Sequence, residues 1–126
     1  MGNRPDRLMR AVVLGHLLIT FAHGAAHGGA SVALAPLAAV FVLIVIEIAP
    51  LAGLLWSLKH RRTGGWIVAV SMIAAFVFGL VNHFVLISPD HVSQVEPAWR
   101  PMFGTTAALL AVTEIAGAAL GIRCAT

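Results

Sequence analysis

The sequence predicts an all-α membrane protein: an antiparallel bundle of four transmembrane helices with the N- and C-termini in the cytoplasm. Three observations lead to this prediction. The chain of 126 residues is 60% hydrophobic and only 10% charged, which is far from the composition of soluble domains. It contains four apolar stretches, each long enough to cross a hydrocarbon core of about 30 Å. Its basic residues gather where an up-and-down bundle would place them on one side.

The four apolar stretches cover about residues 8–30, 36–58, 65–88 and 102–122. In lipid, backbone N–H and C=O groups must form their hydrogen bonds within their own segment, so each stretch is expected to be a helix. The connections are short apart from an outer loop at about residues 89–101. Short connections join antiparallel neighbours, so residues 1–126 are predicted to form a single transmembrane domain.

Basic residues set the predicted orientation of this bundle. They precede the first helix, separate the second from the third and follow the fourth: Arg4, Arg7, Arg10, Lys59, Arg61, Arg62 and Arg123. Because cytoplasmic loops carry the excess of Lys and Arg, we expect a multi-pass protein of the bacterial-type cytoplasmic (inner) membrane. The net charge of +3 is therefore explained by basic residues on the cytoplasmic side of the membrane, and no nucleic-acid partner is expected.

The first helix has a second interpretation. The Arg-rich start MGNRPDRLMR, followed by an apolar run and small residues, is also typical of a secretory signal peptide. We expect this segment to be retained as a helix.

The first helix carries a stripe of histidines that ends in FAHGAAHGG. At 100° per residue, His16, His23 and His27 fall within about 40° of one another, over about 16 Å of helix. Such a stripe must face the bundle interior, a water-filled cavity or a partner chain. The simpler alternative is three neutral histidines that only form hydrogen bonds between helices.

Helix 2 carries an acid close to its midpoint. An ionised Glu47 there costs about 3 kcal/mol, so we expect it to be protonated, paired or bound to a cation. Pro50 cannot donate a hydrogen bond to the carbonyl of Ile46, which predicts a kink beside the acid.

The last two helices contribute further polar residues. Helix 3 has Asn82 and His83 in its outer third, and helix 4 has Glu114 near mid-membrane. Counting depth from the helix centres places His27 and His83 together, about 10 Å outward. The sequence therefore predicts either one elongated site or two adjacent ones, a central His/Glu site and an outer histidine pair.

Imidazole and carboxylate ligands in a buried site suit iron, copper, zinc or manganese. The candidate ligands are His16, His23, His27, Glu47, His83 and Glu114. A more specific form of this hypothesis is haem b held by His27 and His83, with Gly24, Gly28 and Gly79 giving room for the ring. Because no Glu-x-x-His, HExxH or Cys-rich motif is present, a metal would have to be bound across helices. The predicted role is redox-related.

Other functions stay open at this point. Glu47 and Glu114 suit a proton-coupled transporter of small cations or an isomerase that moves protons on lipid-like substrates. A structural subunit of a larger membrane complex would use the same polar residues to contact partner helices. Two GxxxG pairs, Gly24/Gly28 and Gly117/Gly121, are candidates for helix packing or for a homodimer interface.

An internal duplication would relate the two halves of the chain. A shift of 67 residues aligns His16 with His83 and Glu47 with Glu114. A parallel repeat of two helices would place both glutamates symmetrically at the centre of the bundle.

Overall fold

The computed structural model describes residues 3–126, and its regular elements are all helical. They are α1 (Arg4–Gly29), α2 (Pro36–Phe41), η1 (Val42–Ile48), α3 (Ala49–Ser57), α4 (Arg61–Leu80), η2 (Val81–Val85) and α5 (Arg100–Ala125). The described chain has four helical spans long and apolar enough to cross a membrane: Arg4–Gly29, Pro36–Ser57, Arg61–Val85 and Arg100–Ala125. The predicted all-helical class and the four spans are confirmed.

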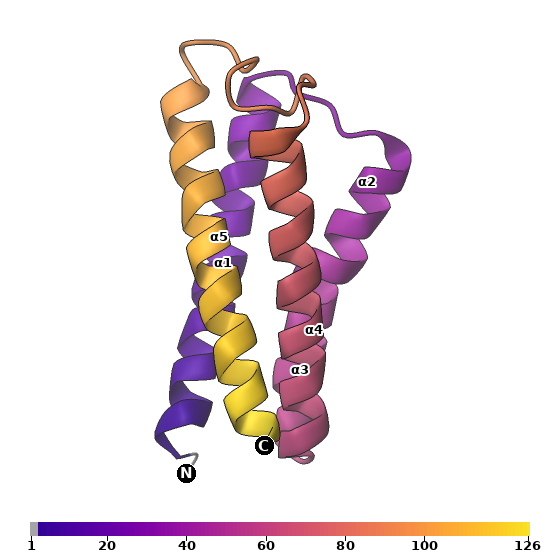
Figure 1. The fold of residues 1–126 in the computed structure, drawn as a ribbon, viewed down its shortest axis with the longest axis vertical. Helices are drawn as coiled ribbons and strands as arrows, with labels where there is room; N and C mark the ends of the chain where they lie inside the picture. The colour runs from indigo at the N-terminus through magenta and orange to yellow at the C-terminus, as the bar shows by residue number, and fades with distance from the viewer. Residues whose placement is uncertain (1–2) are drawn as a thin grey trace.

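The spans run alternately up and down, and both termini lie at the same end of the molecule (Figure 1). The connections at residues 30–35 and 86–99 lie at the opposite end. Helix α2 leans away from the other helices there (Figure 1), and none of its residues is buried.

Helix α1 begins with a capping interaction that its sequence encodes. The side chain of Asn3 accepts a hydrogen bond from the backbone N–H of Asp6 at 3.2 Å. A proline also stands in the first turn of α1, α2 and α5, where its missing N–H costs no helical hydrogen bond. These residues favour helix starts at the positions where α1, α2 and α5 begin.

Helices α4 and α5 approach closely near the termini. A Cβ atom on Gly121 would lie 2.7 Å from the carbonyl oxygen of Gly65, and one on Gly117 would lie 3.0 Å from Met72. The Gly117/Gly121 pair therefore serves packing between two helices of the same chain. Gly24 and Gly28 differ, since a Cβ on either would meet nothing within 4 Å.

The end that holds the termini has an apolar core and a polar link. Its buried core residues are Met9, Val13, Leu54, Val68, Met72, Ala118 and Cys124. Asp6 Oδ1 lies 2.8 Å from Arg61 Nε and accepts a hydrogen bond from the thiol of Cys124 at 3.3 Å. This group joins the starts of α1 and α4 to the end of α5.

The second span is irregular beside Glu47, where the sequence predicts a kink. It is π-helical over Val42–Ile48, and the N–H of Ala49 donates to the carbonyl of Ile44, five residues back. Pro50 has no N–H for the carbonyl of Ile46. The Nε2 atom of His16 lies 3.3 Å from that carbonyl oxygen and supplies a donor from another helix.

Candidate metal centre

The histidine stripe of α1 faces the interior of the bundle, as its spacing predicts. His16 and His23 are 0% and 6% exposed, and His27 is half-buried one turn further on. Thr20, on the same face, donates its hydroxyl to the carbonyl of His16 at 2.9 Å. The stripe thus reaches the end of the bundle opposite the termini.

A π-helical segment, η2, presents His83 to this stripe. The N–H of Leu86 donates to the carbonyl of Val81 at 2.8 Å, five residues back, and the side-chain amide of Asn82 donates to the carbonyl of Phe78 at 2.8 Å. Short π-helical segments are frequent at functional sites. Here the segment directs His83, which is 6% exposed, into the bundle.

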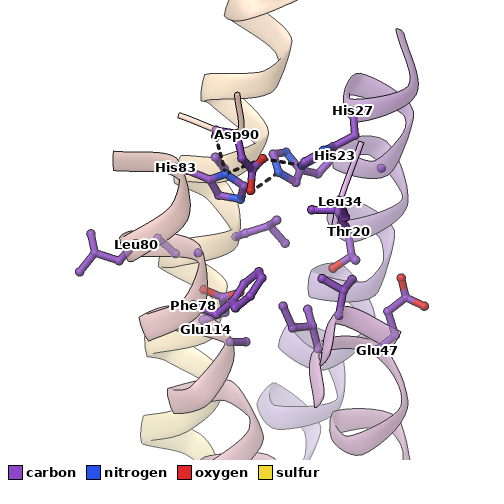
Figure 2. Close-up of a pocket in the computed structure, with 18 of the residues that line it drawn as sticks. Thr20, His23, His27, Leu34, Glu47, Phe78, Leu80, His83, Asp90 and Glu114 are labelled. Carbon is purple, nitrogen blue, oxygen red and sulfur yellow. Dashed lines mark hydrogen bonds and ion pairs between the residues drawn. The ribbon is translucent and has the colours of Figure 1, made fainter. Parts of the chain in front are cut away.

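Three histidines form a compact cluster from two helices. His23, His27 and His83 each offer a ligand nitrogen within 4.8 Å of the others. The Nε2 atoms of His23 and His83 are 3.2 Å apart, and Figure 2 shows both rings at the upper end of the pocket. Two nitrogens bound at 2.0–2.1 Å to a tetrahedral ion lie about 3.3 Å apart. This buried cluster can hold a metal ion.

The Nδ1 atoms of all three histidines have acceptors that determine where the ring protons lie. Nδ1 of His27 is 3.2 Å from the carbonyl oxygen of Val32, and Nδ1 of His83 is 3.1 Å from that of Asp90. A carbonyl oxygen only accepts hydrogen bonds, so both rings carry the proton on Nδ1. In the neutral form of each ring, Nε2 then keeps a free lone pair.

His23 also carries its ring proton on Nδ1. Its Nδ1 lies 2.8 Å from the hydroxyl oxygen of Thr106, and that hydroxyl donates to the carbonyl of Met102 at 2.8 Å. The hydroxyl proton is thus used, and the oxygen accepts from His23. Fixing a histidine through Nδ1–H while Nε2 stays available is the usual arrangement of metal-ligating histidines.

A carboxylate borders the cluster. Oδ1 of Asp90 lies 3.3 Å from Nε2 of His27 and 3.4 Å from Nδ1 of His83, between the two helices (Figure 2). This oxygen is buried and, among the residues that the structure describes, has no hydrogen-bond partner. Buried polar atoms without a partner are rare and require an explanation.

The loop after η2 closes the cluster on the outside. The N–H of Val92 donates to the carbonyl of His83 at 2.9 Å, and Phe103 packs against all three imidazoles at centroid distances of 4.7–5.3 Å. Ser31, with a φ of 55°, turns the chain so that the carbonyl of Val32 meets His27. The ligand side chains are thus held from several directions.

The other candidate ligands lie apart from this cluster. Besides its contact with Ile46, His16 has Nδ1 3.4 Å from the hydroxyl of Thr113, so both its ring nitrogens have protein partners. Glu114 is 3% exposed and lies further along the pocket, behind Phe78, while Glu47 directs its carboxylate away from the histidines (Figure 2). Both acids line the same pocket as the cluster.

Two residues of the site are not found by reasoning from the sequence. From the sequence, Asp90 is expected in a mouth of the outer loop that collects a cation or contacts a periplasmic partner, and not beside the histidines; Thr106 is not singled out. The signal for Asp90 is its position just after Ser88 and Pro89, residues typical of a turn that would fold the chain back on His83. No sequence pattern marks Thr106.

The sequence matches no known family model, and no curated protein or solved structure shows significant similarity to it.

Proposed function

We propose that this protein is a membrane metalloprotein that binds one transition-metal ion through His23, His27 and His83, and that the ion has a redox or catalytic role. The observation that carries the proposal is a cluster of three histidines, each with its Nδ1 beside a protein acceptor, whose ligand nitrogens lie within 4.8 Å of one another. The Nε2 atoms of His23 and His83 are 3.2 Å apart. Lone pairs that face one another repel unless a cation lies between them. The carboxylate oxygen of Asp90, which lies 3.3 Å from Nε2 of His27, adds the negative charge that such a cation requires.

The donor set favours iron, copper, zinc or manganese, because imidazole and carboxylate suit all four ions. A bare ion fits better than haem b. The ring centroids of the three histidines lie only 4.8–5.9 Å apart, with Phe103 against each ring, and a macrocycle between His27 and His83 would have to displace these contacts.

A catalytic or redox role is favoured over a purely structural one because the cluster borders a cavity. Structural sites are closed by four protein ligands, whereas catalytic sites keep a position open. His23, His27, His83 and Asp90 all line the same pocket, so a bound ion would face this space.

Metal analysis of the protein, purified in detergent without a histidine tag and reloaded with each candidate ion, tests this proposal. We expect about one metal atom per chain, falling to near zero in His83→Ala. Asp90→Asn should weaken binding by about tenfold or more. His60→Ala is the matched control, because His60 is exposed and lies outside the cluster.

Two results would contradict the proposal. One is wild-type protein that stays metal-free after reloading while circular dichroism shows it to be helical. The other is a folded His83→Ala variant that keeps a full equivalent of metal.

A second candidate function is proton-coupled cation transport. The observation in its favour is that Glu47 and Glu114 line the same cavity as the histidine cluster. In proteoliposomes with a pH gradient, Glu114→Gln should then stop metal uptake while metal binding survives. Glu96→Gln, in an exposed position of the outer loop, is the control, and absence of uptake by the wild type would rule transport out.

A further inference from the structure

A cavity of about 430 Å³ extends from the histidine cluster along the inside of the bundle. Small-molecule sites typically have volumes of about 300–1,000 Å³. Small residues on two helices leave this space: Ala75 and Gly79 on α4, and Ala107 and Ala111 on α5. The volume is therefore sufficient for a ligand much larger than a metal ion and its water.

The wall of the cavity is mostly apolar and includes a flat aromatic face. Phe78 lines the cavity, and its ring stacks on that of Phe41 with a centroid distance of 4.8 Å and an interplanar angle of 21°. The stack holds the Phe78 ring in place beside the open space (Figure 2). Such a surface favours an aromatic or quinonoid ring over a flexible chain.

The cavity wall also carries a buried carboxyl group away from the histidine cluster, that of Glu114. Glu114 is 3% exposed, and no hydrogen bond to its side chain is found in the chain from residue 3 onward. Buried carboxyl groups are normally hydrogen-bonded. Its position on the cavity wall points to a ligand oxygen as its partner.

The cavity reaches the surface on an apolar side of the molecule. Leu80 and Phe84 line it and are 40% and 39% exposed, and Ala39, on the leaning helix α2, also lines it and is exposed. A molecule dissolved among lipid chains can enter there, whereas a charged solute would have to cross an apolar rim.

We propose that this cavity binds the headgroup of a membrane-dissolved quinone or quinol. Its ring would lie against Phe78, with one oxygen at Glu114 and the other directed toward the histidine cluster. The inference rests on the proposed metal centre for its redox role, but the ring site itself is built by Phe78, Glu114 and the small residues.

The test is the affinity of a short-chain benzoquinone for the detergent-purified protein, measured by calorimetry with and without bound metal. Ala111→Leu places a larger side chain in the cavity and should weaken binding by about tenfold or more. Ala108→Leu is the matched control, since Ala108 is exposed on the same helix, and it should leave the affinity unchanged. Glu114→Leu should weaken binding several-fold, because it removes the carboxyl group that can donate a hydrogen bond to the quinone oxygen.

The outcomes separate this inference from the proposed function. Quinone binding that is lost in Ala111→Leu but present in metal-free protein supports the ring site even if the metal centre fails. Two results overturn the inference even if the metal binds. One is equal affinity of the Ala111→Leu and Ala108→Leu variants for the quinone. The other is a straight-chain alcohol of equal carbon number that binds as tightly as the quinone.

Discussion

The two ends of the bundle use small residues in opposite ways. At the end with the termini, which we call the closed end, Gly65 and Gly121 bring the backbones of α4 and α5 into contact. At the other end, which we call the open end, a Cβ on Gly24 would meet nothing within 4 Å, and one on Gly79 would meet only the edge of His83 at 3.8 Å. Glycine permits helix contact at the closed end, whereas Gly24 and Gly79 leave volume unfilled beside the cavity at the open end, where Gly29 still packs tightly against Trp99.

The two ends also differ in the regularity of their helices. The closed end is built from regular α-helix, while the open end is bordered by the π-helical segments Val42–Ile48 and Val81–Val85. A π-helical turn changes the direction of the side chains that follow it. The irregular segments therefore present His83 and border the cavity, whereas His23 and His27 come from the regular helix α1.

The largest effect is expected at the closed end. Gly121→Ala would place a Cβ 2.7 Å from the carbonyl oxygen of Gly65 and 2.8 Å from the N–H nitrogen of Ala69. Backbone atoms cannot move aside, so we expect the free energy of unfolding to fall by about 3 kcal/mol. Denaturant titration in detergent, followed by circular dichroism, measures this loss.

The control belongs to the open end. Gly24→Ala meets nothing and should leave the free energy of unfolding unchanged or raise it by about 0.5–1 kcal/mol through helix propensity. Equal destabilisation by both substitutions would remove the distinction between the ends.

A smaller effect is expected for His16, which lies between the two ends. His16→Ala leaves the carbonyl of Ile46 without its donor and creates a cavity at a side chain that is 0% exposed. The free energy of unfolding should fall by about 2 kcal/mol, while the metal content stays at the wild-type level. A variant that loses its metal but keeps its stability would instead place His16 in the metal centre.

The smallest effect concerns the fixing of His23. Thr106→Val keeps the volume but removes the hydroxyl that accepts from Nδ1 at 2.8 Å. Metal affinity, measured by competition with a chelator, should fall by about tenfold. Thr105→Val, at the exposed neighbouring position, should change nothing; similar losses in both variants would show that the hydroxyl of Thr106 has no special role.

Much of the open end is predictable from the sequence. The 100° spacing brings His16, His23 and His27 to one buried face, and depth counting brings His27 and His83 to the same level. Both inferences depend only on regular helix geometry. They succeed because α1 is regular over its whole length, from Arg4 to Gly29.

The remainder of the site depends on departures from that geometry. The turn that brings Asp90 back to His83 comes directly after the π-helical segment Val81–Val85. Glu47, which lies apart from the histidines, is within the π-helical segment Val42–Ile48. Pro50 predicts the irregularity beside Glu47 but not its π-helical form. The segment at Val81–Val85 has no sequence signature, since its cost is balanced by packing and by side-chain hydrogen bonds such as that of Asn82. Residue type alone therefore groups the acids with the histidines, and the structure places them along the cavity instead.

The π-helical segment at Val81–Val85 has a consequence for comparing this chain with any relative. The segment behaves as an α-helix with one inserted residue, and His83 lies within it. A single-residue gap at this position in an alignment with a regular α-helix would therefore keep the following side chains in the same direction. An alignment without that gap would instead pair residues whose side chains point about 100° apart.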